Sequence, residues 1–271
     1  IRAGDDRTQP QKRVSSVVRL AHSPVGAAAA FVTQSHCPRT PIIPALHTFA
    51  NGIRVHSGHL IQVQIDRYAA GVNLHEPVEE DWIMKLLKSS AASSGIFVDI
   101  GAAIGYYCFL VHMLKPDYEL HAYEPDEQNR ARLRENLDQN ASPTVHLHEQ
   151  GVDTHSGRDS LMGEGFGACV VPGGGGTQVQ TTTIDEITAG FRRPVDLLKM
   201  DIQGGEGPAF LGASRSLRDR SVRNWVIGTH SPDLHHFCIQ TLRHFNHRII
   251  FEALNVEHQP DGLIVAATGR R

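Results

Sequence analysis

An acidic residue and two glycines stand close together in the segment FVDIGAAIG, which covers residues 97–105. An apolar run precedes Gly101 and a helical apolar period follows Gly105, so the segment predicts a strand, a tight turn and a helix. Glycines at such a turn let a ligand come close to the backbone. Asp99 lies two residues before the turn, and its carboxylate is expected at the mouth of a ligand site.

The spacing of the glycines distinguishes two kinds of nucleotide ligand. Dinucleotide sites use the pattern G-x-G-x-x-G, whereas this chain has G-x-x-x-G from Gly101 to Gly105. A carboxylate at Asp99 would repel a pyrophosphate but suits the ammonium or sulfonium group of S-adenosylmethionine. Charge complementarity therefore favours this methyl donor, and an NAD-dependent oxidoreductase is the alternative.

A second acidic residue, Glu124, ends the next predicted strand and is followed by Pro125. It comes about 20 residues after the glycine turn, where an acid binds ribose hydroxyls in folds of this kind. Pro125 cannot continue the strand and directs the chain into a helix that starts at Asp126. We therefore predict that Glu124 holds the ribose of the donor, and an exposed or helix-capping glutamate is the structural alternative.

Two further polar residues follow later strands of the predicted sheet. Asp201 comes after the apolar run 195–200 and His230 after the run 225–229. Ligands of open α/β sheets bind outside the carboxyl ends of the strands, so both side chains are expected at one rim.

Methylation of a hydroxyl requires a group that removes its proton. His230 is the predicted base, because the ordinary pKa of imidazole lies near neutrality, and a purely structural histidine is the alternative. Asp201 is the second candidate base. It would also be the ligand of a divalent ion if one takes part, although no clustered ligand motif in the sequence indicates a metal.

The scaffold for these residues is an alternation of strands and helices. Strands are expected at 96–100, 119–123, 145–152, 195–200, 225–229, 248–251 and 263–267, and helices at 104–114, 126–140, 208–217 and 234–245. This order predicts an α/β fold, a Rossmann-like sheet with helices on both faces whose last two strands form an antiparallel edge. Residues 163–176 include four consecutive glycines and are expected to be poorly ordered or to act as a lid over the acceptor.

The chain divides into three parts by pattern. Residues 1–45 contain five prolines and no persistent period, which predicts a poorly ordered N-terminal arm. Residues 46–92 predict a small β-plus-helix lid, with strand-like runs around Ser57-Gly58 up to Ile65 and a helix that opens at Pro77. Residues 93–271 are the expected donor-binding domain.

Composition narrows the class of protein. The 271 residues are 40% hydrophobic and 20% charged, as in globular proteins, and the net charge of −3 gives no general attraction to nucleic acid or to an anionic membrane. The four scattered cysteines fit neither a zinc knuckle nor a disulfide framework and favour reduced thiols in a cytosol. No apolar run reaches the roughly 18 residues of a membrane helix. We therefore expect a cytoplasmic protein without nucleic-acid or membrane partners, and the sequence leaves homo-oligomerisation open.

Taken as a set, four motifs resemble those of the FkbM family of S-adenosylmethionine-dependent methyltransferases. They are FVDIGAAIGYY at 97–107, AYEPD at 122–126, TTID at 182–185 and LKMDIQGGE at 198–206, and NLHEP at 73–77 resembles the family's approach segment. The resemblance implies a class I methyltransferase fold and O-methylation of a hydroxyl on a sugar, a polyketide or a similar natural-product small molecule.

The resemblance also implies a set of donor-binding residues, with the segment 150–153 near the adenine. The expected set is Glu76, Asp99, Gly101, Ala103, Gly105, Tyr106, Glu124, Pro125, Gly151, Val152 and Asp201. The chain departs from the family pattern at Ala103, where the family often has Asn, and at Gln203 and Gly205, where it usually has Glu and Ala. A non-catalytic module with a degenerate donor pocket is a third alternative, which Ala103 favours and the retained acids oppose.

Overall fold

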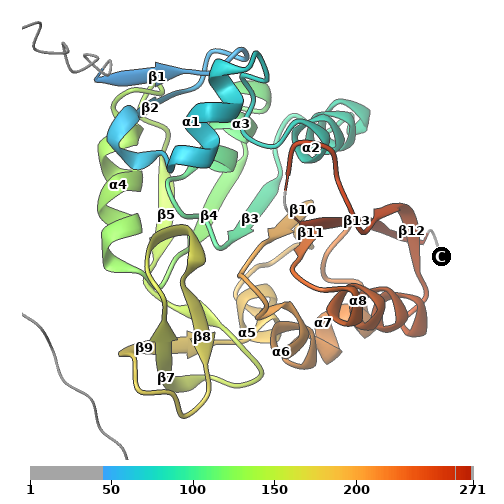
Figure 1. The fold of residues 1–271 in the computed structure, drawn as a ribbon. Coiled ribbons are helices and arrows are strands. Elements are labelled where there is room, and N and C mark those ends of the chain that lie inside the picture. The colour runs from blue at the N-terminus through green and yellow to red at the C-terminus, as the bar shows by residue number, and fades with distance from the viewer. Residues whose placement is uncertain (1–44, 260, 270–271) are drawn as a thin grey trace, which may run out of the picture. The chain divides into compact units, whose positions relative to one another are not determined.

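A computed structural model describes residues 45–259 and 261–269, so the expected N-terminal arm lies, except for its last residue, outside the described residues. The main sheet has seven strands in the order β12-β13-β11-β10-β3-β4-β5 (Figure 1). The parallel strands are β3 (Ile96–Ile100), β4 (Glu119–Tyr123), β5 (Val145–His148), β10 (Leu197–Met200) and β11 (Asn224–Thr229). The expected antiparallel edge is confirmed, because β13 (Gly262–Thr268) pairs antiparallel with both β11 and β12 (His247–Ala253).

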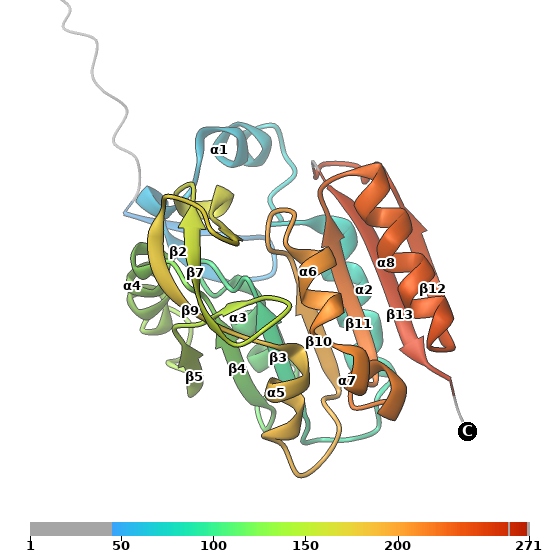
Figure 2. The ribbon, with the colours of Figure 1, turned by 90° about the horizontal axis from the view of Figure 1, so that it is seen from below.

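Helices cover both faces of this sheet, as Figure 2 shows. One face carries α5 (Ile184–Ala189), α6 (Glu206–Leu211), α7 (Ser214–Asp219) and α8 (Pro232–His244), and the other carries α2 (Pro77–Ser89), α3 (Tyr106–Leu114) and α4 (Glu127–Leu137). Strand β3 illustrates the cause: Phe97 packs in one apolar cluster, whereas Ile96 and Val98 pack in the other. Because successive side chains of a strand point to opposite faces, a strand covered on both faces is mostly apolar, and Asp99 is the exception in β3. The expected class I fold is confirmed.

The segment before α2 contains β1 (Leu46–Thr48), β2 (Arg54–His56), a short 3-10 helix η1 (Ser57–His59) and α1 (Gln62–Ala69). The prediction that the apolar run up to Ile65 is strand-like was wrong beyond β2, because residues 62–69 are helical. The Gln64 side chain accepts a hydrogen bond from the Ile61 backbone N–H and so satisfies the start of this helix. Phe49 and Tyr68 join the same apolar cluster as α2 and α3, so the segment packs directly on the main domain.

A second sheet accounts for two departures from the sequence prediction. Its order is β6-β9-β7-β8, formed by β6 (Gly151–Val152), β7 (Gly157–Met162), β8 (Cys169–Val171) and β9 (Thr177–Thr182). The single strand expected at 145–152 is therefore two strands in two sheets. Strand β4 ends at Tyr123, and Pro125 has no N–H to donate, so β5 has no ladder partner beyond His148.

The glycine-rich segment 163–176 is the second departure. It contains the 3-10 helix η2 (Gly165–Gly167) and the strand β8, which pairs antiparallel with β7. The expectation of poor order was therefore wrong for residues 169–171, because pairing of Cys169, Val170 and Val171 with β7 satisfies the backbone there.

The single helix expected at 208–217 is two helices, α6 and α7, separated at Gly212-Ala213. The Gly212 carbonyl accepts the Asp185 N–H, and a Cβ at Gly212 would lie 2.4 Å from the Asp153 carbonyl oxygen. Close approach of two other segments at Gly212 therefore interrupts the helix. Over the described part of the chain, no helix is both long and apolar enough to cross a membrane, and Cys108, Cys169 and Cys238 are free thiols.

Candidate active site

The glycine turn between β3 and α3 brings two strand ends together. Gly101 has φ +82° and Gly105 has φ +87°, a left-handed conformation that side chains rarely adopt. A Cβ on Gly101 would lie 2.0 Å from the Asp201 carbonyl oxygen, so glycine is required for the turn to touch the end of β10. A Cβ on Gly105 would lie 2.8 Å from Leu133 Cγ, so Gly105 serves the packing of α3 against α4. The donor contact expected at Gly105 is absent from the linings of the two cavities described below.

This geometry predicts a large effect on folding. Gly101→Ala is expected to lower the free energy of unfolding by about 2–5 kcal/mol, about 1–2 from the left-handed backbone and the rest from the overlap. Gly71→Ala is the matched control, because Gly71 has φ +103° but no atom within 4 Å of its added Cβ. Only the conformational cost of about 1–2 kcal/mol is expected there. Urea unfolding measures both, and equal losses would show that the contact with Asp201 is unimportant.

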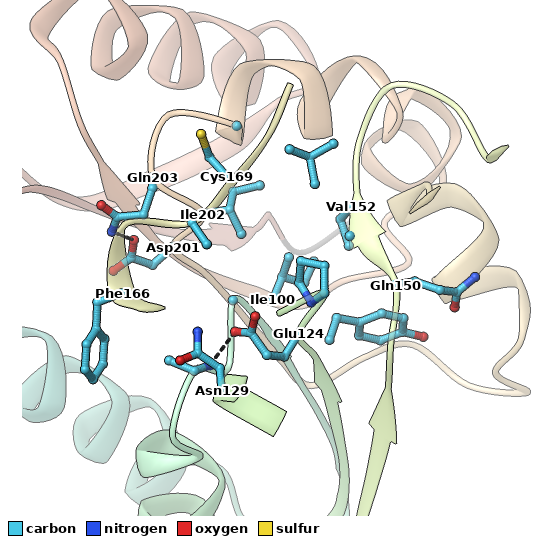
Figure 3. A pocket seen from close by; sticks show the side chains of 18 of the residues that line it. Ile100, Glu124, Asn129, Gln150, Val152, Phe166, Cys169, Asp201, Ile202 and Gln203 are labelled. Atoms are coloured by element: carbon cyan, nitrogen blue, oxygen red, sulfur yellow. Dashed lines mark hydrogen bonds between the residues drawn. The ribbon is translucent and has the colours of Figure 1, made fainter. Parts of the chain in front are cut away.

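A narrow cavity lies at the ends of β3 and β4, and Figure 3 shows Glu124 among its side chains with Asn129 beside it. Glu124 is 4% exposed. One carboxylate oxygen accepts the Ala103 N–H at 2.8 Å and the other accepts the Asp126 N–H at 2.9 Å. Burial raises the pKa of Glu124 to about 7, although both hydrogen bonds favour the ionised form.

Most of the expected donor residues meet in this cavity. It is lined by Gly101, Ala103, Glu124, Pro125, Gly151, Val152 and Asp201, together with Gln150, Ile202 and others. Its volume is about 40 Å³, room for a few water molecules at about 10–15 Å³ each. Phe166, Cys169 and Val170 of the η2–β8 segment form part of the wall, so a nucleoside requires displacement of that segment.

A larger cavity of about 670 Å³ adjoins the first and shares Gly101, Ala103, Phe166, Asp201 and Gln203 with it. Glu76 and Tyr106, two further expected residues, line it. The Tyr107 hydroxyl donates to the Glu76 carboxylate at 2.5 Å, which fixes one polar wall. Charged groups of both signs face the cavity, including Arg67, Lys199 and Asp261.

Asp99 is fully buried beneath the turn and is absent from the linings of both cavities. The expectation that its carboxylate stands at the mouth of the site was wrong, because side chains of β3 alternate and this one points toward α3, where Cys108 Sγ lies 3.9 Å from it. Burial raises the pKa of Asp99 to about 6, although Lys199 acts in the opposite direction.

Lys199 connects Asp99 to the site. Its Nζ lies 3.9 Å from Asp99 Oδ1 and 3.9 Å from Asp201 Oδ2, and 4.9 Å from the centre of the Tyr107 ring. Burial alone would lower the pKa of Lys199, but the negative charges of Asp201 and Asp99 have a larger effect and raise it. The lysine therefore keeps its positive charge. Asp99 therefore acts through Lys199, which presents a positive charge to the larger cavity.

His230 follows β11, which ends at Thr229 as expected. Its Nε2 lies 3.3 Å from Asp201 Oδ1 and 3.4 Å from Asp261 Oδ1, and its Nδ1 lies 3.1 Å from Glu206 Oε1. Burial lowers the pKa of His230, but the Glu206 hydrogen bond and the charges of Asp201 and Asp261 raise it to about 9. The premise of an unshifted pKa was therefore wrong: without a bound cation, the imidazole is protonated at neutral pH and is not a free base.

Asp261 and Lys199 are site residues that the sequence reasoning missed. The signal for Asp261 was present, because an antiparallel edge strand next to β11 pairs Thr229 with Gly262 and so brings the preceding residue beside His230. Burial raises the pKa of Asp261 to about 6, which His230 opposes. Lys199 lay inside a recognised motif, but only the three-dimensional packing shows that it separates two carboxylates.

Three of the solved structures that this chain resembles are methyltransferases. The methyltransferase FkbM of Methylobacillus flagellatus KT is 20% identical with a TM-score of 0.49, and the match covers 76% of this chain and 55% of that one. Precorrin-6y C5,15-methyltransferase of Geobacter metallireducens is 13% identical with a TM-score of 0.48, covering 73% and 90%. Magnesium protoporphyrin IX methyltransferase of Synechocystis, solved with bound S-adenosylmethionine, is 9% identical with a TM-score of 0.48, covering 78% and 86%.

A comparison with proteins of curated function found no match. The sequence model of the methyltransferase FkbM domain matches residues 99–249, more than half of the chain. This match spans the glycine turn, Glu124, Asp201 and His230, and confirms the resemblance found in the motifs. The chain therefore belongs to the FkbM methyltransferase family.

Proposed function

We propose that this chain transfers the methyl group of S-adenosylmethionine to a hydroxyl of a small molecule. The observation that carries the proposal is the pair of adjoining cavities, one lined by Glu124 and the other large, which share Gly101, Ala103 and Asp201. A donor bound across this junction would place its reactive end beside Asp201. The donor supplies an electrophilic methyl group, and the protein supplies position and a proton acceptor.

The residues of the narrow cavity fit a nucleoside. Each oxygen of Glu124 accepts one backbone N–H and has a further lone pair for a ribose hydroxyl. Pro125, Val152 and Ile202 provide apolar surface for a base. Gly101 and Ala103 of the turn line the same cavity.

The larger cavity supports a small-molecule acceptor. Its volume of about 670 Å³ lies within the range of about 300–1,000 Å³ common for small-molecule sites. Tyr106 and Ile104 give apolar walls, while Lys199, Arg67 and the carboxylates offer hydrogen-bond partners of both kinds. This mixture suits a neutral, hydroxylated molecule such as a sugar or a polyketide.

Asp201 lines both cavities and is the proposed base, which removes the proton of the acceptor hydroxyl. His230, protonated between Asp201, Glu206 and Asp261, holds these carboxylates in place and limits their mutual repulsion. Both residues predicted at this rim remain in the proposed machinery: Asp201, the second candidate base, is the proposed base, and His230, the first candidate, is a positioning residue.

The test combines donor binding and product analysis. S-adenosylhomocysteine at about 100 times its Kd should stabilise the chain by about 2.7 kcal/mol, and NAD should not. Incubation with S-adenosylmethionine carrying a labelled methyl group and a panel of hydroxylated compounds should give an O-methylated product. Stabilisation by NAD alone would support the oxidoreductase, and donor binding without transfer to any compound would support a non-catalytic module.

The cover of the narrow cavity gives a further expected result. Because residues 165–170 restrict it to about 40 Å³, S-adenosylhomocysteine should change amide hydrogen exchange in this segment. Exchange in β12, the strand at the far edge of the sheet, should stay the same. Unchanged exchange at 165–170 on saturation with the ligand would show that the segment is not a lid.

A further inference from the structure

We propose that Asp201, His230 and Asp261 form a binding site for a divalent metal ion at the rim of the larger cavity. The site lies at the ends of β10 and β11 and at the start of β13, three neighbouring strands of the main sheet. The catalytic use of such an ion rests on the proposed function, whereas the binding of the ion does not.

The separations of the three side chains fit common coordination geometry. One potential ligand atom from each residue lies within 4.8 Å of the others. Nε2 of His230 is 3.3 Å from Asp201 Oδ1 and 3.4 Å from Asp261 Oδ1. Ligand bonds of about 2.0–2.2 Å, in tetrahedral or octahedral arrangement, separate neighbouring ligand atoms by roughly 3.0–3.5 Å. One ion can therefore contact all three groups with little movement.

The orientation of the imidazole is that of a metal ligand. Nε2 is buried and makes no hydrogen bond within the described structure, although two carboxylates lie near it. Nδ1 is hydrogen-bonded to Glu206, whose carboxylate also accepts the Ile202 N–H at 2.9 Å. A carboxylate that holds one ring nitrogen and leaves the other free for a metal is the usual arrangement of ligating histidines.

The site is open on the side where chemistry would occur. Asp201 and Asp261 both line the larger cavity, so coordination positions beyond the three protein ligands can take water or an acceptor hydroxyl. One imidazole nitrogen and two carboxylate oxygens suit a divalent first-row ion such as Mn²⁺. When bound, such an ion lowers the pKa of a coordinated hydroxyl.

Two other clusters serve as controls, because they also contain potential ligands. Glu119, His121 and His146 form one, and Asp153, His155 and Asp159 form the other. In the first, both ring nitrogens of His121 already have partners, His148 and Glu119. Neither cluster contributes to the linings of the two cavities at the proposed active site.

The experiment is titration of the chelator-treated full chain with Mn²⁺ alone, followed by calorimetry and by the loss of the free-ion paramagnetic resonance signal. We expect one saturable site, at least tenfold weaker binding in Asp261→Asn, and unchanged binding in His146→Ala. A wild-type far-UV circular dichroism spectrum and cooperative urea unfolding show that Asp261→Asn is folded.

Absence of saturable Mn²⁺ binding, or binding that survives in Asp261→Asn and disappears in His146→Ala, overturns the proposal. A second variant, His230→Gln, must also bind the ion at least tenfold more weakly, and full retention there contradicts the ligand set. A chain that binds Mn²⁺ as expected but fails to bind S-adenosylhomocysteine keeps the metal site and loses the proposed methyltransferase function.

Discussion

Asp201→Asn is expected to slow methyl transfer by about 10²–10⁴-fold, the usual contribution of a positioned general base. The substitution keeps the size of the side chain and an oxygen for the hydrogen bond from Gln203 Nε2, which lies 3.2 Å from Asp201 Oδ1. It removes the negative charge that can accept a proton. Asp201 lies at the junction of the two cavities, and its carboxylate is also a ligand in the proposed metal site.

Single-turnover rates with saturating donor measure this effect without interference from product release. The matched control is Asp233→Asn, an exposed aspartate in the first turn of α8, which should leave the rate unchanged. S-adenosylhomocysteine affinity of Asp201→Asn, measured in parallel, shows whether the loss lies in chemistry or in donor binding. A rate within a few-fold of the wild type would remove Asp201 from the mechanism in both its roles.

For His230, the sequence predicted the position of the residue but not its protonation state. The sequence placed this residue correctly at the rim, because strand ends of a parallel sheet share one edge. Its protonation state depends on Glu206 and on Asp261, which come from other segments of the chain. An ordinary imidazole pKa is the default only for a histidine without such neighbours.

For Asp99, the sequence predicted the position of the residue but not the direction in which its side chain points. The motif placed it next to the turn, but the alternation of β3 points it away from the cavities and toward Cys108. The preference for S-adenosylmethionine was argued from its charge at the mouth, and that argument fails because Lys199 stands between. The preference for S-adenosylmethionine is supported instead by the match to the FkbM methyltransferase family.

The main sheet was predictable because its strands are short apolar runs separated by amphipathic helices. The second sheet was not, since β6 has only two residues and β8 lies in a glycine-rich stretch. Both strands exist because of pairing with β7 and β9, which local sequence does not show. This sheet carries Gly151 and Cys169 to the narrow cavity, so the donor side of the site depends on the least predictable part of the fold.

Glu124→Ala is expected to weaken binding of S-adenosylhomocysteine by about 1–3 kcal/mol, the scale of hydrogen bonds to a charged group. Glu124 also accepts the Ala103 N–H, and Ala103 has φ +45°, so removal of the carboxylate loosens the turn as well. Titration calorimetry of the variant measures the change. Glu127→Ala, an exposed glutamate three residues away, is the control and should bind as the wild type does.

The pH dependence of stability and of donor affinity tests whether the charge of Glu124, and not only its size, matters. Burial raises its pKa from the ordinary 4.5 to about 7, so the folded chain holds this proton more tightly than the unfolded chain. The contribution of Glu124 to stability therefore falls as the pH rises from about 4.5 through about 7. Ribose hydroxyls donate better to the ionised carboxylate, so donor affinity should rise over the same upper range, from pH 6 to pH 8. Glu124→Gln should bind weakly at both pH values, and an equal rise in that variant would show that another group controls the effect.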